Sequence, residues 1–321
     1  MGRKLPIECP AAPENAFKVF EKERICQTTY HIELVTPLFG GGAVAGENDP
    51  VTLIRGPGIR GNLRFWWRAT RGAKFENIDE LRKREGEIWG TASYPSPVTI
   101  NVNIINGSVV KEPWHDYRGK LNRSVRGVRG VIDFIVREQM NIKDVKITTS
   151  AKFSLTISWP KNNNLKDDIE AAVWAWVNFG GLGARTRRGC GAMYCSKLSP
   201  SLKEVDSLKD WYKRRLDKYS IELPLETRDW PTLPEPNKIL IQQNSGWVAP
   251  LEAWAKSVYV MQKFRQGLGI GRQRKSNSKY GRSLWPEADS LRNITGQAHK
   301  SFQNRITGNK DAFPRAEFGL P

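Results

Sequence analysis

The order of strand-like and helix-like stretches in the first 200 residues limits the fold more than any other feature of the chain. Alternating apolar and polar side chains indicate a half-buried strand, whereas apolar side chains recurring every three or four residues indicate an amphipathic helix. Alternation occurs at about 27–35, 98–104 and 153–159, and 192–197 is interpreted as a closing strand. Helical spacing occurs at 59–71 and 78–89, between the first two strands, and at 169–179, between the last two. This βαββαβ order predicts an α+β, ferredoxin-like (RRM-like) unit with one open sheet face.

The rest of the chain predicts a second unit, because 321 residues are enough for two domains of ordinary size. Its expected elements are a strand at 238–243 and a helix at 251–264. Too few elements follow to complete a second sheet. The predicted divisions are an N-terminal arm (1–23), a ferredoxin-like domain (24–200) with a basic insertion (107–149), and a second, smaller or incomplete ferredoxin-like domain (201–321).

Positive charge is concentrated in patches. The net charge is +18, from 51 Lys and Arg against 33 Asp and Glu. Four windows without an acidic residue hold 24 of these cations, and the remaining sequence is net negative; the windows are 51–75, 117–132, 171–203 and 253–286. Such patches are typical of polyanion binding. We found no stretch that would span a bilayer and no signal peptide, so we expect a cytoplasmic protein without a membrane partner.

The first helical stretch carries a basic face. Arg60, Arg64 and Arg68 recur every four residues, and like charges at that spacing weaken a helix by a few tenths of a kcal/mol per pair. We therefore expect this face to meet an anion, with a turn at Gly56-Pro57-Gly58 placing the helix N-terminus beside it. A solvated basic surface is the alternative. In the next helix, the mixed-charge run Asp79–Glu85 is predicted to be exposed.

A glycine-rich segment, Gly180–Gly191, follows the last helix of the first unit. Its glycines allow the backbone to approach a phosphate closely, and Arg185, Arg187 and Arg188 supply charge. It lacks the GK[ST] ending of a Walker A motif. It also follows a helix, whereas a dinucleotide-binding fingerprint follows a strand. The alternative is a helix stop followed by a basic turn. We favour RNA binding, with this loop and the arginine helix as two walls of one groove.

The candidate RNA-binding residues come from these two segments and from a third basic segment near the C-terminal helix. They are Arg55, Arg60, Arg64, Arg68, Arg71, Gly181, Gly183, Arg185, Arg187, Arg188, Gly189, Lys263, Arg265, Arg272, Arg274 and Lys275. No cofactor site is expected. A metal site is not expected either, because the four cysteines do not have zinc-ligand spacing.

Five motifs in this order resemble the RAMP proteins of CRISPR type III-B (Cmr) effector complexes, and most of all the first-numbered Cmr RAMP subunit. They are Thr36–Gly42 (TPLFGGG), Ile59–Arg68 (IRGNLRFWWR), Gly181–Gly191 (GLGARTRRGCG), Trp285–Glu287 (WPE) and Phe313–Pro321 (FPRAEFGLP). The resemblance implies two ferredoxin-like RAMP units and a place near the 3′ end of the guide RNA (crRNA). It also implies target RNA and neighbouring RAMP subunits as partners. The family normally continues beyond Pro321, so the second unit is expected to be incomplete or completed by another chain.

The resemblance further implies that another subunit cleaves the target, so we expect no enzymatic activity and no catalytic residue here. One alternative is a metal-independent RAMP endoribonuclease that processes guide RNA, with His31 on the first strand as general base. A second alternative is a scaffold whose basic patches bind acidic protein surfaces.

Overall fold

The structure is a computed structural model, and it describes residues 25–42, 48–49, 51–111, 146–201, 204, 207–239, 249–274 and 280–287. The predicted N-terminal arm and the Phe313–Pro321 motif lie outside these residues, as does the centre of the insertion.

A four-stranded antiparallel sheet forms one layer of the first unit. Its strands are β1 (Ile25–Leu34), β2 (Thr99–Gly107), β5 (Ala151–Pro160) and β6 (Met193–Tyr194), in the order β2-β5-β1-β6. The predicted order of strands and helices is therefore confirmed. The closing strand is shorter than predicted, because only Met193 and Tyr194 pair with β1. At the base of the insertion, β3 (Val110–Lys111) pairs with β4 (Lys146–Ile147).

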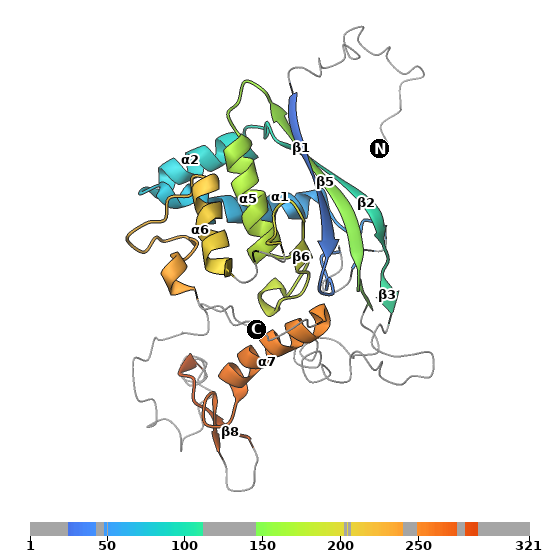
Figure 1. Cartoon of the computed structure of the whole chain (residues 1–321), viewed down its shortest axis with the longest axis vertical. Helices are drawn as coiled ribbons and strands as arrows, with labels where there is room; N and C mark the ends of the chain where they lie inside the picture. Colours follow the sequence, from blue (N-terminus) through green and yellow to red (C-terminus); the bar gives the residue numbers. More distant parts are fainter. Residues whose placement is uncertain are drawn as a thin grey trace, which may run out of the picture.

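The helices cover one face of this sheet (Figure 1). They are α1 (Gly56–Ala69), α2 (Ile78–Trp89), α5 (Lys166–Phe179) and α6 (Leu208–Lys218), with a 3₁₀ helix (Arg71–Lys74) between the first two. The predicted turn at Gly56-Pro57-Gly58 is wrong, because α1 begins at Gly56. Pro57 suits the first turn of a helix, where no intrahelical partner is available for the N–H that proline lacks.

The core lies between the sheet and the helices. Tyr30, Ile32 and Leu34 of β1 are buried, as their alternation predicts. Helix α5 is buried on nearly all sides because it lies between the sheet and α6. Its Trp174 contacts the rings of Trp211, Tyr212 and Tyr219, so α6 is held to the first unit by aromatic packing.

The opposite sheet face is polar, in agreement with the predicted open face. His31 and Glu33 of β1 are exposed on it, and Glu33 forms an ion pair with Lys152 of β5, 3.2 Å between Oε2 and Nζ. Thr29 and Thr156 are joined across the two strands by a 3.0 Å hydrogen bond between their hydroxyls. Among the described residues, no helix covers this face in Figure 1.

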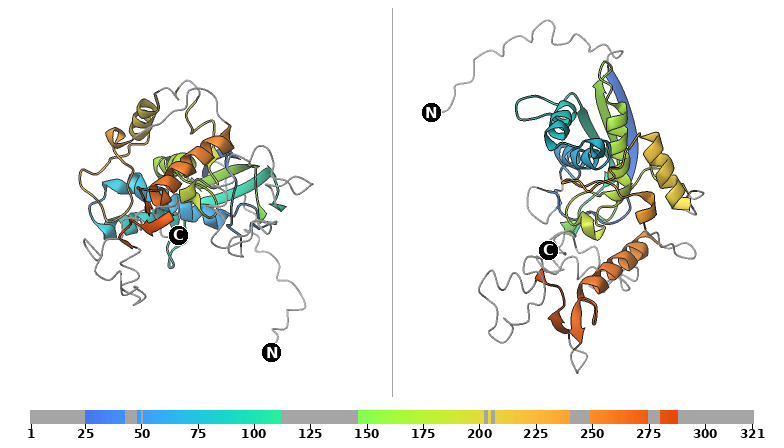
Figure 2. Two further views of the ribbon diagram at one scale, coloured as in Figure 1. Left: turned by 90° about the horizontal axis from the view of Figure 1, so that it is seen from below. Right: turned by 90° about the vertical axis from the view of Figure 1, so that its left-hand side faces the viewer.

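A second group of elements lies below the sheet-and-helix body (Figures 1 and 2). Helix α7 (Pro250–Gln266) is followed by a hairpin of β7 (Arg272–Arg274) and β8 (Tyr280–Ser283). The predicted helix at 251–264 is confirmed. Of the predicted strand at 238–243, Lys238 ends a 3₁₀ turn and residues 240–243 lie outside the described part of the chain. None of the described helices has the length and apolar character needed to cross a membrane.

Candidate nucleic-acid interface

The arginine face of α1 meets an anion that belongs to the protein itself. Arg64 Nε and Arg68 Nη1 each donate a 2.7 Å hydrogen bond to Oε1 of Glu85 on α2. The prediction that Glu85 is exposed is wrong, since only 4% of this residue is accessible. One turn earlier, Arg60 Nη2 donates to the carbonyl oxygen of Val98 at 2.8 Å. Two of the three arginines therefore already have a carboxylate partner.

Asp168 of α5 forms a second buried ion cluster beside the first. Its Oδ1 accepts a 2.7 Å hydrogen bond from Trp67 Nε1, and its Oδ2 accepts one of 2.9 Å from Arg84 Nη2. Arg71 Nε lies 3.7 Å from Oδ1, and Arg71 Nη1 donates to the carbonyl of Ser220 at 2.8 Å. Burial lowers the pKa of Arg84, but Asp168 and Glu87 more than reverse this and raise it above its ordinary value. Arg71 is therefore also engaged inside the protein.

The glycine-rich loop is fastened to the segment that follows β1. The amide of Ala184 donates to the carbonyl of Phe39 at 2.6 Å, and the amide of Gly191 donates to the carbonyl of Pro37 at 2.8 Å. Gly191 has a φ of +68°, and a Cβ there would lie 2.0 Å from the carbonyl oxygen of Leu182, so only glycine fits. The TPLFGGG and GLGARTRRGCG motifs thus pack on each other.

The loop is also held by α7. Trp254 of α7 donates from Nε1 to the carbonyl oxygen of Arg188 at 2.8 Å. A Cβ on Gly189 would lie 2.8 Å from Cδ1 of Trp254, so the indole lies directly against the loop backbone. Arg185 has a left-handed conformation, with a φ of +59°, and its guanidinium lies over the ring of Phe39 at 5.4 Å. Arg187 is exposed.

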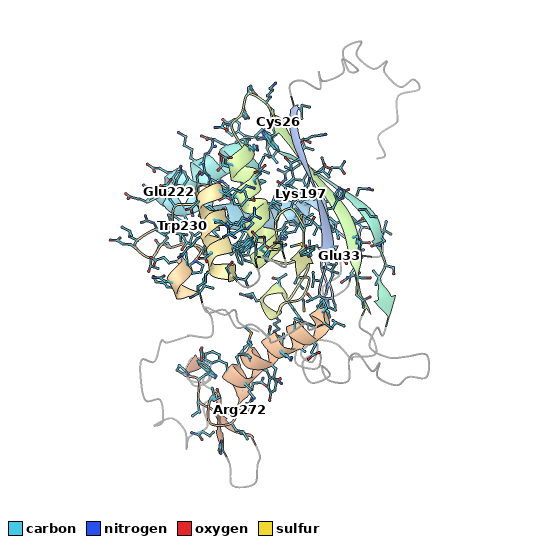
Figure 3. The ribbon with its side chains drawn as sticks, viewed as in Figure 1. Cys26, Glu33, Lys197, Glu222, Trp230 and Arg272 are labelled. Carbon is cyan, nitrogen blue, oxygen red and sulfur yellow. The ribbon has the colours of Figure 1, made fainter. Side chains whose placement is uncertain are left out.

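The C-terminal cations lie on α7 and the hairpin beyond it. Lys263 is exposed, with its Nζ 4.7 Å from the ring centroid of Tyr259. Arg272 and Arg274 lie on β7, and Figure 3 marks Arg272 in the lower part of the molecule. Lys275 lies outside the described residues. The contact between Trp254 and Arg188 joins this basic segment to the glycine-rich loop.

These contacts change the predicted groove. In the described part of the chain, the arginines of α1 contact α2 and Val98, the residue before β2. The loop contacts residues 36–39 and α7, and at its first glycine it also meets α1, since a Cβ on Gly180 would lie 2.6 Å from Nε1 of Trp66. Through these contacts the loop touches α1 at Trp66 and not at its arginine face. Among the other predicted RNA-binding residues, Arg55 and Gly183 are exposed and Gly181 is buried.

Beside the arginine face lies an open cleft of about 700 Å³. Its lining combines Arg60 and Arg64 of α1, Arg82 and Glu85 of α2, and the start of β2. Burial and the nearby Arg64 lower the pKa of Arg60. Within the described residues, Arg60 Nη1 is buried and has no hydrogen-bond partner. Because three arginines and one carboxylate line the cleft, it carries an excess of positive charge.

His31 is exposed on the open sheet face, opposite Ser154 of β5. Asn103 of β2 lies across from Ser154. A hydroxyl and then an amide side chain therefore follow the imidazole across the sheet. Among the described residues, no group of three or more His, Cys, Asp or Glu is placed to hold a metal ion.

Sequence reasoning missed Glu85, Asp168 and Trp254 as residues that organise these sites. A signal existed for Glu85, which lies four residues after Leu81 and three before Ile88, on the apolar side of α2. Trp254 lies on the predicted helix at 251–264, but its partner Arg188 is 66 residues away along the chain.

Comparison with known proteins gives a consistent result. The family model described as the RAMP superfamily matches residues 31–194. Two relatives from Pyrococcus furiosus are named CRISPR system Cmr subunit Cmr1-2 and Cmr1-1. The first is 26% identical over 193 residues, covering 55% of this chain and 98% of the relative; the second is 25% identical over 181 residues, covering 51% and 50%. The crystal structure of Cmr1 from Pyrococcus furiosus (apo form) has a TM-score of 0.44 at 20% identity, covering 79% of each chain.

Proposed function

The chain belongs to the RAMP superfamily, and we propose that it is a non-catalytic RNA-binding subunit of a type III-B CRISPR-Cas (Cmr) effector complex. The Cmr names of both curated relatives support this proposal. In this role the protein contacts the 3′ region of the guide RNA, helps to capture target RNA for antiviral defence, and contacts neighbouring RAMP subunits. Helix α7 and the β7–β8 hairpin would belong to a second, abbreviated ferredoxin-like unit.

The hydrogen bond from Trp254 to the carbonyl of Arg188 carries the RNA-binding part of this proposal. It brings two separately predicted basic segments, the glycine-rich loop and α7 with its hairpin, into one region. Arginine and lysine hold a phosphate backbone without reading sequence, so cations brought into one region suit RNA. Specificity would come from base pairing between guide and target.

RNA affinity measured against salt concentration tests this proposal. Each phosphate contact contributes about 0.7 to the slope of log K against log salt for a single strand. Arg187→Ala should lower the slope by about that amount, because Arg187 is the exposed arginine of the loop. Lys83→Ala is the matched control, since Lys83 is an exposed cation on α2, away from the loop. A flat salt response in the unmodified protein would contradict RNA binding.

The non-catalytic part is tested separately. The purified protein is incubated with CRISPR repeat RNA in EDTA, and cleavage is followed on a denaturing gel. We expect intact RNA, because Ser154 and Asn103 across from His31 are a hydroxyl and an amide, and the carboxylate of Glu33 on the same face is paired with Lys152. Specific cuts that disappear in His31→Ala would establish the endoribonuclease alternative instead.

A further inference from the structure

Strand β2 forms one edge of the four-stranded sheet, and among the described residues no strand pairs with its outer side. Its second half is open to solvent, since Asn103 to Gly107 are all exposed and Ile105 is 57% accessible. An edge strand presents a row of main-chain N–H and C=O groups that can pair with another strand. The chemistry of this edge therefore suits an extended polypeptide.

The edge lacks the charges that normally prevent such pairing. Proteins commonly protect exposed edges with lysine, other charges, proline or a bulge. Residues 91–110 contain no Asp, Glu, Lys or Arg, although 26% of the whole chain is charged. The one protective feature within β2 is the irregularity between Ile104 and Asn106. The run Thr99–Ile104, before that irregularity, is therefore a regular and uncharged edge.

The arginine-lined cleft lies beside this same run. Thr99 and Ile100 line it together with Arg60, Arg64 and Arg82. Alternate side chains of a strand point to opposite faces of the sheet. A strand added beside Thr99–Ile104 would therefore direct every second side chain toward the helix layer and the mouth of the cleft.

The charge of the cleft selects what such a side chain should be. Its lining holds three arginines against one carboxylate, Glu85, and Glu85 already bonds Arg64 and Arg68. Arg60 Nη1 is buried and has no hydrogen-bond partner among the described residues. A carboxylate would give this nitrogen a charge-assisted hydrogen bond, the strongest kind that a guanidinium makes.

From the edge and the cleft together, we infer that β2 accepts an extended segment of another protein chain as an additional strand. An Asp or Glu of that segment occupies the arginine-lined cleft. Main-chain pairing supplies affinity, and the carboxylate fixes the register of the segment. A protein segment fits better than RNA, because the edge offers main-chain pairing groups, and Thr99, Asn101 and Asn103 on its open-face side are all neutral.

This inference rests on the proposed function, because the partner would be another subunit of the complex. The chain is co-expressed with the other Cmr subunits and purified through a tag, both alone and in the complex. Hydrogen exchange should slow by about tenfold or more at amides within Thr99–Ile104, and only in the complex. Benzoylphenylalanine at position 101 should cross-link to one protein segment that contains an acidic residue.

Charge variants supply the second measurement. Asn101→Lys places on the exposed edge the kind of charge that discourages strand pairing, so it should weaken assembly by about tenfold or more. Arg82→Ala should weaken assembly severalfold, because Arg82 lines the cleft, is 70% accessible at its side chain and can be removed without opening the core. Lys83→Ala, the neighbouring exposed cation outside the cleft lining, should leave assembly unchanged.

The outcomes separate this inference from the proposed function. If no complex forms with the unmodified chain, the proposed function fails. If the complex forms but the amides of Thr99–Ile104 exchange as in the isolated chain, the inference alone is wrong. A cross-link from position 101 to RNA in place of a protein segment would assign the edge to RNA and overturn the protein-segment proposal.

Discussion

The two arginine-rich segments of the chain are alike in composition and differ in what surrounds them. On α1, Arg64 and Arg68 lie against the buried carboxylate of Glu85. In the glycine-rich loop, the backbone is held by Trp254 and by residues 36–39, while Arg187 is exposed. Regular spacing of arginines thus indicates that a basic face meets an anion, but the spacing does not say whether that anion is a ligand or part of the fold.

The substitution Glu85→Gln should distinguish the two arginine-rich segments most strongly, because it should lower stability through α1 without changing RNA affinity. It keeps the shape of the side chain but leaves Arg64 and Arg68 without their counter-charge. We expect a loss of about 2–3 kcal/mol in the free energy of unfolding, below the full value for a buried pair because both arginines are about one-third accessible. Urea unfolding measures the loss.

RNA affinity of the folded Glu85→Gln protein should stay close to that of the unmodified protein. Glu85→Asp, which keeps the charge on a shorter side chain, is the control. A rise in RNA affinity without loss of stability would contradict the comparison, because it would mean that Glu85 competes with RNA for the arginines of α1.

A smaller effect is expected at the other segment. Trp254→Phe keeps an aromatic ring against Gly189 but removes the N–H that donates to Arg188. A hydrogen bond of this kind contributes about 1 kcal/mol, so RNA affinity should fall roughly fivefold if the bond fixes the loop for binding. Filter binding at constant salt measures the change.

Trp211→Phe is the matched control for Trp254→Phe. Its indole is also buried, but its Nε1 has no hydrogen-bond partner among the described residues. RNA affinity should therefore be unchanged by Trp211→Phe. Equal losses in the two variants would mean that general destabilisation, and not the position of the loop, lowers affinity.

Local chemistry made much of the first unit predictable, and distant contacts account for what was missed. The bounds of α2 agree with prediction because Asn77 caps its first turn and Gly90 follows its last residue. The start of α1 was wrong because Pro57 favours both a turn and a first helical turn. The contact between Trp254 and Arg188 could not be predicted from periodicity, since it depends on how α7 meets the loop.

Cys190 tests whether the loop is dry beneath its arginines. Burial raises the pKa of its thiol to about 12, although Arg185 and Arg188 act in the opposite direction. In the unfolded chain the thiol titrates near 8.5. The resulting stabilisation is complete below that pH and declines as the pH rises toward the folded-state value.

Between pH 7.5 and 9.5, the unmodified protein should therefore lose roughly 1 kcal/mol more stability than Cys190→Ala, which cannot ionise there. Urea unfolding at the two pH values measures this difference, and Cys26→Ala is the control because Cys26 is only half-buried. An equal loss in Cys190→Ala would mean that water reaches the thiol. The loop would then match the alternative interpretation of its sequence, a helix stop followed by a basic turn. Its backbone as well as Arg187 would be solvated, in contrast to the internally paired arginines of α1.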